Sequence, residues 1–173
     1  MTTYARTVAG RGQDAWQPLE DHLSSVANLA AALAGKFDSS DAARIAGAWH
    51  DIGKYAPAFQ RLLTASADGE SVEAVDHSTA GAILAAKLLR GEVGAWIAFV
   101  IAGHHAGLSN HLHLRDRLQQ REGLLSAVRA AGGERVPGSA ATPSVPEWLT
   151  DPSVGAAFLG SRLCGARHAF SVH

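Results

Sequence analysis

The sequence predicts a single all-α domain, and three observations support this. Apolar residues recur at helical spacing along most of the chain, turn-forming residues separate these stretches, and no alternating pattern of useful length indicates a strand. With 173 residues, 47% of them apolar and 18% charged, the chain is long enough for one domain with a substantial core and short for two. We therefore expect residues 1–173 to form one helical domain.

The first predicted helix presents one apolar stripe, formed by Leu19, Leu23, Val26, Ala30 and Leu33. His22 precedes Val26 by four residues, so it borders this stripe and faces inward. Gly35 is expected to end the helix. Ser40 or Asp41 can cap the second helix, which runs through Ile45 and Trp49 to the pair His50-Asp51. Gly53 then breaks it.

Pro57 fits the first turn of a third helix, which carries Phe59, Leu62 and Leu63. Residues 64–76 are predicted to form a polar loop. A fourth helix opens at His77-Ser78, with Asp76 or Ser78 as its cap, and buries Ile83, Leu84, Leu88 and Leu89. A fifth helix spans residues 93–101 and stops at residues 103–107, where two glycines bracket a double histidine.

The remaining elements are a polar sixth helix over residues 112–131, a loop over residues 132–146, and a last helix that carries Phe158, Leu159 and Leu163. Asp151-Pro152 is typical of a helix start.

Composition limits the function classes. The net charge of −1 gives no global basic field for nucleic acid, although a local basic groove stays open. The single cysteine, Cys164, excludes an internal disulfide framework and is expected to be a buried apolar residue. The N-terminal residues lack the apolar segment of a signal peptide, and the longest apolar run, residues 95–102, is too short to cross a membrane. We expect a cytoplasmic protein without a membrane partner.

The histidines carry the chemical signal. An adjacent His-Asp pair at positions 50 and 51 is unusual at the end of an apolar helix, and a carboxylate can bridge two cations. The intervals from His22 to His50, from Asp51 to His77 and from His77 to His104 are 28, 26 and 27 residues, about one helix and one loop each. Candidate ligands on successive helices can converge on one bundle interior. This pattern predicts a metal site rather than separate core histidines, and it points to hydrolysis.

The motifs around this pair resemble those of a known family. The run AWHDIGKYAPAFQRLL, followed by DHSTAGAILA and IAGHHAGL, is similar to the HD nuclease domain of type I CRISPR interference, a member of the HD phosphohydrolase superfamily. The order and spacing of the blocks match over roughly residues 16 to 110. The resemblance implies an HD-type helical domain with its metal site in the bundle interior.

The same resemblance implies one or two divalent cations, as Mn, Ni, Co, Fe or Mg. His22, His50 and Asp51 would hold the first, and Asp51 would bridge to the second, which His77, His104 and His105 complete. Asp51 and Lys54 would be the catalytic residues, with the Lys54 ammonium near the scissile phosphate; the alternative is a solvated lysine at a helix end. Ser78 would orient the phosphate or cap its helix.

The family has a further metal-binding aspartate shortly after a Phe-Ser pair on its last helix. Phe170-Ser171 is the corresponding pair, and the chain stops at His173, before the expected aspartate. Of the two aspartates that follow the double histidine, we expect Asp116 to be solvated and Asp151 to cap a helix. His168 and His173 are not expected to substitute. This departure, through truncation or genuine variation, predicts a weakened first metal position and reduced or absent nuclease activity.

The sequence therefore favours a metal-dependent nuclease that cleaves single-stranded DNA in CRISPR antiviral defence, with a superfamily-2 helicase, fused or separate, and a CRISPR effector complex as partners. Five arginines in residues 111–135 give a mild basic bias that fits either phosphate contacts or a solvated helix face: Arg115, Arg117, Arg121, Arg129 and Arg135. Two alternatives stay open, namely an HD phosphohydrolase of nucleotides and a non-catalytic HD module. The native metal, the choice between endonuclease and exonuclease, and the oligomeric state are not specified.

Overall fold

The computed structural model describes residues 2–107, 110–132, 141–144 and 146. Its two short strands and three 3-10 turns are β1 (Tyr4–Arg6), β2 (Gln17–Pro18), η1 (Gln13–Ala15), η2 (Gly35–Phe37) and η3 (Ile52–Tyr55). Seven α-helices occupy the described ranges: α1 (Leu19–Ala34), α2 (Ser40–Trp49), α3 (Pro57–Ala67), α4 (Thr79–Leu88), α5 (Gly91–Ala106), α6 (His111–Gln120) and α7 (Gly123–Gly132).

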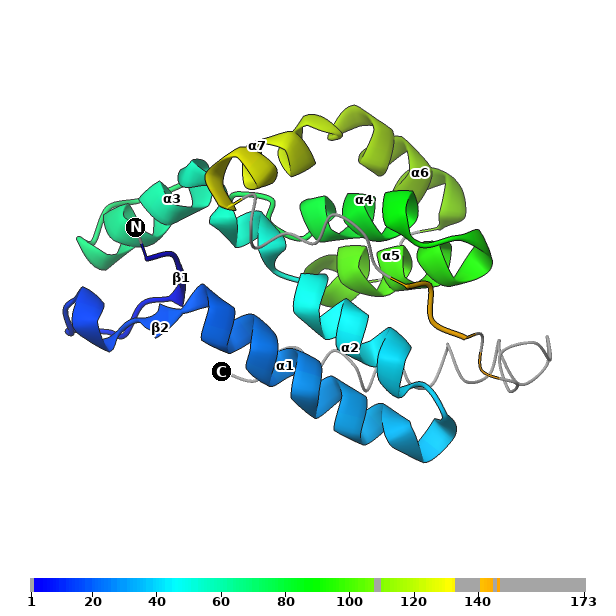
Figure 1. The fold of residues 1–173 in the computed structure, drawn as a ribbon. Coiled ribbons are helices and arrows are strands. Elements are labelled where there is room, and N and C mark those ends of the chain that lie inside the picture. Colours follow the sequence, from blue (N-terminus) through cyan, green and yellow to red (C-terminus); the bar gives the residue numbers. More distant parts are fainter. Residues whose placement is uncertain (1, 108–109, 133–140, 145, 147–173) are drawn as a thin grey trace.

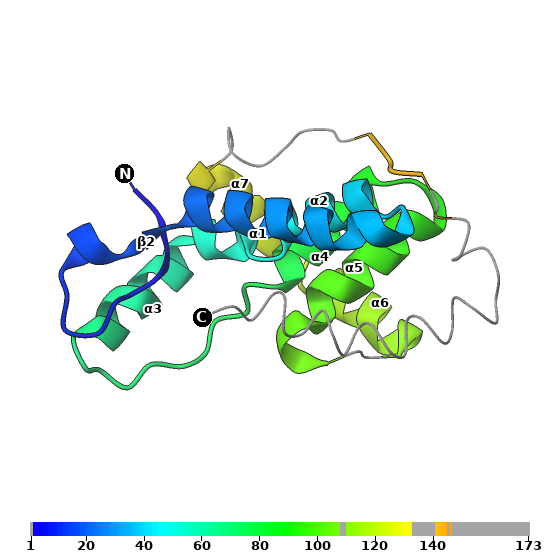
Figure 2. The ribbon, with the colours of Figure 1, turned by 90° about the horizontal axis from the view of Figure 1, so that it is seen from below.

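The helices form two antiparallel pairs that share a core. α1 lies against α2, α4 lies against α5, and α2 joins the pairs by packing on α5 (Figure 1). α6 and α7 arch over α4, and α3 gathers with the short strands at one end (Figures 1 and 2). The fully buried apolar side chains include Leu19, Ile52, Leu84, Ile101 and Val128, one from each of five elements. The all-α prediction is therefore confirmed.

The buried face of α1 differs from the predicted stripe. The buried residues are Leu19, Leu23, Ala27, Ala30, Ala31 and Ala34, whereas Val26 is half-buried and Leu33 is exposed. The reason is the close approach of α2, since a Cβ on Gly47 would lie only 2.7 Å from the Cα of Ala27. Alanines, rather than the larger residues beside them, therefore occupy the contact.

α2 begins at Ser40, so its N-cap position lies at Ser39, one residue before the predicted cap Ser40. Ser39 is the N-cap, but its hydroxyl donates to the carbonyl of Phe37 and makes no capping hydrogen bond to the helix. The hydroxyl of Ser40 donates instead to the carbonyl of Ala31 at 3.0 Å and thereby joins α2 to α1. The predicted end of α1 at Gly35 is confirmed, because this glycine is the C-cap.

Two boundaries late in the described chain were predicted wrongly. α5 continues through the double histidine to Ala106, so His104 and His105 lie in its last helical turn instead of in a loop. Gly107 then ends the helix with a φ of 78°, a left-handed value that suits glycine. The predicted sixth helix is two helices, α6 and α7, with a turn between them that lets both follow the surface of α4.

The loop predicted for residues 64–76 is shorter at its start, because α3 extends to Ala67. Pro57 occupies the first turn of α3, as predicted. α4 begins at Thr79, two residues after His77, so His77 belongs to the preceding loop. The predicted last helix, with Asp151 and Cys164, lies outside the described residues.

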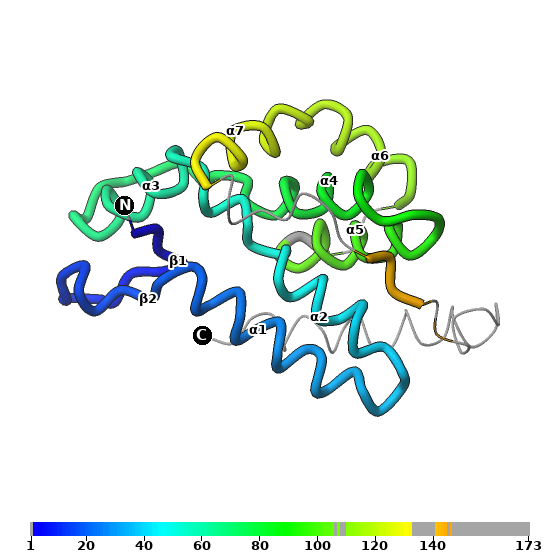
Figure 3. The backbone as a smooth tube through the Cα atoms, viewed as in Figure 1, coloured from blue at the N-terminus to red at the C-terminus, as the bar shows by residue number. Residues whose placement is uncertain are grey.

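The short antiparallel pair β1–β2 has no counterpart in the sequence-based prediction. Gln60 on α3 accepts a hydrogen bond from the Tyr4 amide at 3.0 Å and donates to the Tyr4 carbonyl at 2.9 Å. The amide of Gln60 also reaches the carbonyl of Lys54 at 2.7 Å. One side chain therefore ties the N-terminal segment and η3 to α3. The backbone trace in Figure 3 shows β1 and α3 at the same end of the molecule.

Candidate metal centre

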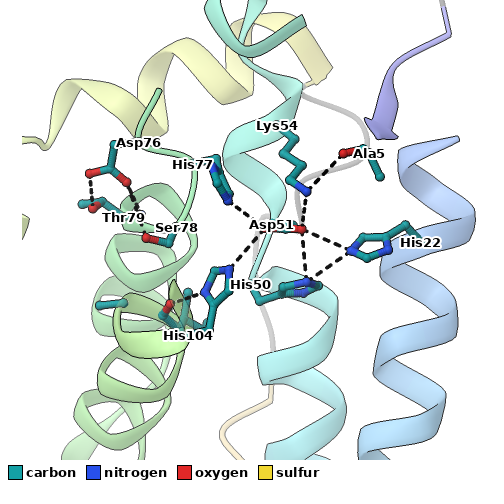
Figure 4. A network of polar contacts seen from close by, with 12 residues as sticks. Ala5, His22, His50, Asp51, Lys54, Asp76, His77, Ser78, Thr79 and His104 are labelled. Carbon is teal, nitrogen blue, oxygen red and sulfur yellow. Dashed lines mark hydrogen bonds and ion pairs between the residues drawn. The ribbon is translucent and has the colours of Figure 1, made fainter. Parts of the chain in front are cut away.

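Four separate segments bring the predicted ligands together around one carboxylate (Figure 4). His22 comes from the first turns of α1, His50 and Asp51 follow the end of α2, His77 precedes α4, and His104 and His105 end α5. α2 ends at Trp49, and the His50 amide still donates to the Ala46 carbonyl at 2.9 Å. His50 and Asp51 are both buried, with 1% and 3% of their surface exposed.

The ligand atoms form two groups that share Asp51. We call His22, His50 and Asp51 the first metal position, and Asp51, His77, His104 and His105 the second metal position. Within each group one ligand atom per residue lies within 4.8 Å of all the others. The structure thus brings all six predicted ligand residues together, while their role as ligands stays a prediction.

Oδ2 of Asp51 faces the first metal position. It lies 3.1 Å from Nε2 of His22 and 3.2 Å from Nε2 of His50, and these two imidazole nitrogens are 3.3 Å apart. The Nζ atom of Lys54 lies 2.8 Å from the same oxygen. Three nitrogen groups therefore surround one carboxylate oxygen.

Oδ1 of Asp51 faces the second metal position. It lies 3.5 Å from Nε2 of His77 and 3.4 Å from Nε2 of His104. These separations are longer than ordinary hydrogen bonds, so we treat them as electrostatic contacts. The ring of His105 closes the group, with its centroid 4.1 Å from that of His104 and 4.8 Å from that of His77.

Backbone carbonyls fix the orientation of three imidazoles. Nδ1 of His50 donates to the Gly47 carbonyl at 2.8 Å, and Nδ1 of His104 donates to the Ile101 carbonyl at 2.6 Å, each three residues back in its helix. Nδ1 of His77 donates to the Val75 carbonyl at 3.1 Å. Because a carbonyl only accepts, the proton of each neutral ring is on Nδ1, and the Nε2 lone pair points at Asp51.

Three buried polar atoms in this cluster have no hydrogen-bond partner within the described chain, namely Oδ1 of Asp51, Nε2 of His77 and Nε2 of His104. A carboxylate oxygen and two imidazole lone pairs that converge without a proton between them repel one another, and burying them costs free energy. A divalent cation would satisfy all three atoms at once. The donor set therefore fits a metal ion, and His/Asp clusters of this kind could hold one or two.

Protonation states favour the same interpretation. Burial alone would raise the pKa of Asp51, but the hydrogen bonds and positive charge that protonated rings of His104, His22 and His50 would supply outweigh it and hold that pKa well below its usual range. Burial lowers the pKa of His77, and it lowers the pKa of His105 to about 4 together with the nearby His104 and His77. His105 is exposed as a residue, but its ring lies against the other two. At neutral pH the rings of His77 and His105 are thus uncharged, beside an anionic carboxylate.

Lys54 is held inside the cluster rather than solvated at a helix end. Its side chain is 13% exposed, and Nζ donates to the carbonyl of Ala5 at 3.1 Å in addition to its contact with Asp51. The ammonium also lies 5.3 Å from the ring centre of Phe59. The strand β1 and the start of α3 thus position the one cationic side chain that touches the shared carboxylate within the described chain.

Two glycines allow the segments to approach this closely. A Cβ on Gly53 would lie 2.1 Å from the carbonyl oxygen of His77, and a Cβ on Gly81 would lie 2.0 Å from the carbonyl oxygen of Trp49. Both contacts are far inside the normal limit, so a side chain at either position would push apart the segments that carry the ligands. Gly53 matters for this approach rather than for breaking a helix.

Sequence reasoning missed a polar network behind His77. Ser78 is the N-cap residue of α4, but its side chain makes no capping hydrogen bond. Asp76 instead accepts hydrogen bonds from the Thr79 amide at 3.0 Å and the Thr79 hydroxyl at 2.7 Å. Ser78 is buried and accepts a hydrogen bond from Arg117 at 2.9 Å. Arg121 pairs with Asp76 at 2.6 Å. The signal in the sequence was the run of polar residues at positions 76–79, which reads as an ordinary helix start.

The predicted basic surface is only partly present. Arg117 and Arg121 are engaged with Asp76, while Arg115 and Arg129 are exposed. Asp116 is exposed on α6, away from the ligand groups, as expected for a solvated residue. Other candidates lie outside the described residues: Arg135, Asp151, His168 and His173.

Comparison with known proteins agrees with this geometry. The family described as "Cas3, HD domain" matches residues 5–150, a range that contains both metal positions and Lys54. No curated protein matches the chain. Among the helices that the structure describes, none has the length and apolar character needed to cross a membrane.

Proposed function

The chain belongs to the Cas3 HD-domain family, and from this premise we propose that it is a metal-dependent nuclease that hydrolyses single-stranded DNA in CRISPR antiviral defence. Family membership implies a CRISPR-associated HD nuclease, and the buried His/Asp cluster is consistent with that activity. The preference for single strands is the finer part of the proposal. The observation that carries the proposed metal-dependent activity is the shared carboxylate of Asp51, with two imidazole nitrogens aimed at one of its oxygens and no hydrogen-bond partner for them within the described chain.

We propose that the six clustered residues hold one or two divalent cations. When bound, such a cation activates water and neutralises charge on the phosphodiester. Asp51 contributes to both positions through its two oxygens, and the Nδ1 hydrogen bonds of His50, His77 and His104 keep their lone pairs directed inward before any cation arrives. The chain therefore meets its cation with an already ordered set of donors.

Lys54 is the second catalytic residue of the proposal. Its ammonium is already held beside the Asp51 carboxylate, so a cation at the first metal position would compete with it for Oδ2. A lysine released from that contact beside the metal positions would be available to stabilise negative charge on a bound phosphate group. The Lys54 side chain is only 13% exposed and its ammonium lies over the Phe59 ring, which restricts where that charge can go.

The donor chemistry favours some metals over others. The second metal position offers three imidazole nitrogens and one carboxylate, a mixture that suits Mn, Fe, Co or Ni at least as well as Mg, which prefers oxygen ligands. It also offers four ligand residues, whereas the first metal position offers three among the described residues. We propose that the second metal position binds its cation more tightly.

The partners follow from the same premise. We propose that residues 1–173 act as one HD domain. Its partners would be a superfamily-2 helicase, fused or separate, which supplies the unwound DNA strand, and a CRISPR effector complex. Exposed Arg115 and Arg129 are available to contact the DNA backbone.

The test is to incubate the protein with Mn²⁺ or Ni²⁺ and circular single-stranded DNA, beside a panel of nucleotides. We expect cleavage of the circle, loss of cleavage in Asp51→Asn, and retained cleavage in Asp116→Asn, whose exposed carboxylate provides the matched control. Turnover of nucleotides alone would instead identify a nucleotide phosphohydrolase. A folded protein that binds cations and cleaves neither substrate would identify a non-catalytic HD module. The smaller donor set that the first metal position has among the described residues favours this alternative.

A further inference from the structure

Arg117 makes more contacts than its place on a polar helix suggests. Its side chain is 27% exposed, and every nitrogen of the guanidinium group donates a hydrogen bond. Nε donates to the Thr79 hydroxyl at 2.8 Å, Nη2 donates to the Ser78 hydroxyl at 2.9 Å, and Nη1 donates to the Ala102 carbonyl at 3.1 Å. Nη2 also lies 3.4 Å from both oxygens of Asp76.

The partners of Arg117 belong to two different ligand-bearing segments. Ser78 and Thr79 directly follow His77, and Ala102 lies two residues before His104 in the last turns of α5. The guanidinium group therefore joins the chain that carries His77 to the helix that carries the double histidine. Because the fork of the guanidinium group is planar and rigid, it also fixes the spacing between these two segments.

These contacts argue against a direct role of Arg117 in holding DNA. Its donors are already directed at protein acceptors, and Asp76 supplies the opposing charge. The same Asp76 fixes the start of α4 through the Thr79 amide and hydroxyl. Thr79 is fully buried, so its hydroxyl cannot exchange these partners for water. The network thus acts on the geometry of the loop behind His77.

We propose that Arg117 is a positioning residue that sets the distance between His77 and the His104-His105 pair, and through it the cation affinity of the second metal position. The proposal rests on the proposed function in one respect, namely that a divalent cation binds there. Loss of residues that orient metal ligands typically weakens metal binding about 10- to 100-fold. We expect a loss in that range when the fork of Arg117 is removed.

The experiment isolates the second metal position by using His22→Ala as the parent, because His22 belongs to the first metal position alone. Co²⁺ is titrated into the parent and into the parent with Arg117→Lys, and binding is followed by the visible absorption of the bound cobalt. Lysine keeps the charge but cannot join Thr79, Ser78 and Ala102 at once. Arg115→Lys, on the same helix and exposed, is the matched control.

We expect about 10- to 100-fold weaker cobalt binding and a changed absorption band in Arg117→Lys, with the control like the parent. Far-UV circular dichroism in chelator checks that each protein is folded. If Arg117→Lys does not fold, Thr79→Val replaces it, because this substitution removes one hydrogen-bond acceptor of the Arg117 guanidinium group at nearly constant volume. A smaller loss of cobalt affinity is then expected. Equal affinity and an unchanged band in a folded variant would overturn the inference alone. Absence of cobalt binding by the parent would refute the proposed metal centre and the inference with it.

Discussion

Asp76→Asn tests whether the charge of Asp76 stabilises the loop behind the metal centre. Burial alone would raise the pKa of Asp76, but hydrogen bonds from Thr79 and the charges of Arg117 and Arg121 outweigh it and lower the pKa from 3.8 to about 2. A difference of that size corresponds to about 2 kcal/mol of stability. Because Arg121 is half exposed and screened by salt, we expect about 1 to 2 kcal/mol at neutral pH.

The sign of the pH dependence follows from the lowered pKa. The folded state holds the carboxylate more firmly ionised than the unfolded chain does, so the contribution is fully present well above pH 3.8 and is lost as the pH falls from 3.8 toward 2. Urea unfolding of the wild type and of Asp76→Asn at pH 7, 5, 4 and 3.5 measures the difference. The gap between the two proteins should be constant from pH 7 to 5 and then narrow.

Asp116→Asn is the control for that series, because Asp116 is exposed on α6 and should show no such gap. A gap for Asp76→Asn that is absent at pH 7, or that widens as the pH falls, would refute the assignment of the charge network.

Three further substitutions probe other parts of the structure. Gly53→Ala should lower the free energy of urea unfolding by about 1 to 3 kcal/mol and weaken Mn²⁺ binding, because its Cβ would meet the carbonyl of His77. Wild-type stability and wild-type Mn²⁺ affinity would contradict the close approach of Gly53 to His77. Lys54→Met should tighten cation binding at the first metal position severalfold, because it removes the ammonium that competes for the shared carboxylate, and it should reduce DNA cleavage. Weaker cation binding by this variant in calorimetry would argue against competition between the ammonium and the cation. Leu19→Ala should lower the free energy of unfolding by about 2 to 5 kcal/mol, whereas Leu33→Ala should change it by less than about 0.5 kcal/mol, measured by thermal or urea unfolding. Similar losses for the two variants would contradict the burial of Leu19 and the exposure of Leu33 on α1.

The fold class and the convergence of the ligand residues could be predicted from the sequence, because both depend on local patterns of residues along the chain. Helical periodicity identified α1 to α5, and near-equal spacing of His22, His50, His77 and His104 indicated one ligand per segment. The motif resemblance assigned both ligand groups to the residues that the structure brings together.

Details that depend on contacts between segments were not predictable in this way. The stripe of α1 shifted to alanines because Gly47 of α2 approaches closely, and no pattern within α1 reports that neighbour. The roles of Gln60 and Arg117 arise from partners 56 and 38 residues away, in the segments of Tyr4 and Thr79. Such residues look like ordinary surface polar groups in the sequence. The extension of α5 through the double histidine likewise contradicts what the flanking glycines suggested.

The most direct test of the central claim, that one carboxylate serves two cation positions, is calorimetric titration of Mn²⁺ into the wild type and into Asp51→Asn. We predict one tight and one weaker binding event in the wild type and the loss of both in Asp51→Asn, because each oxygen of the carboxylate faces one ligand group. Binding of Mn²⁺ by Asp51→Asn with wild-type affinity at either position would contradict the account.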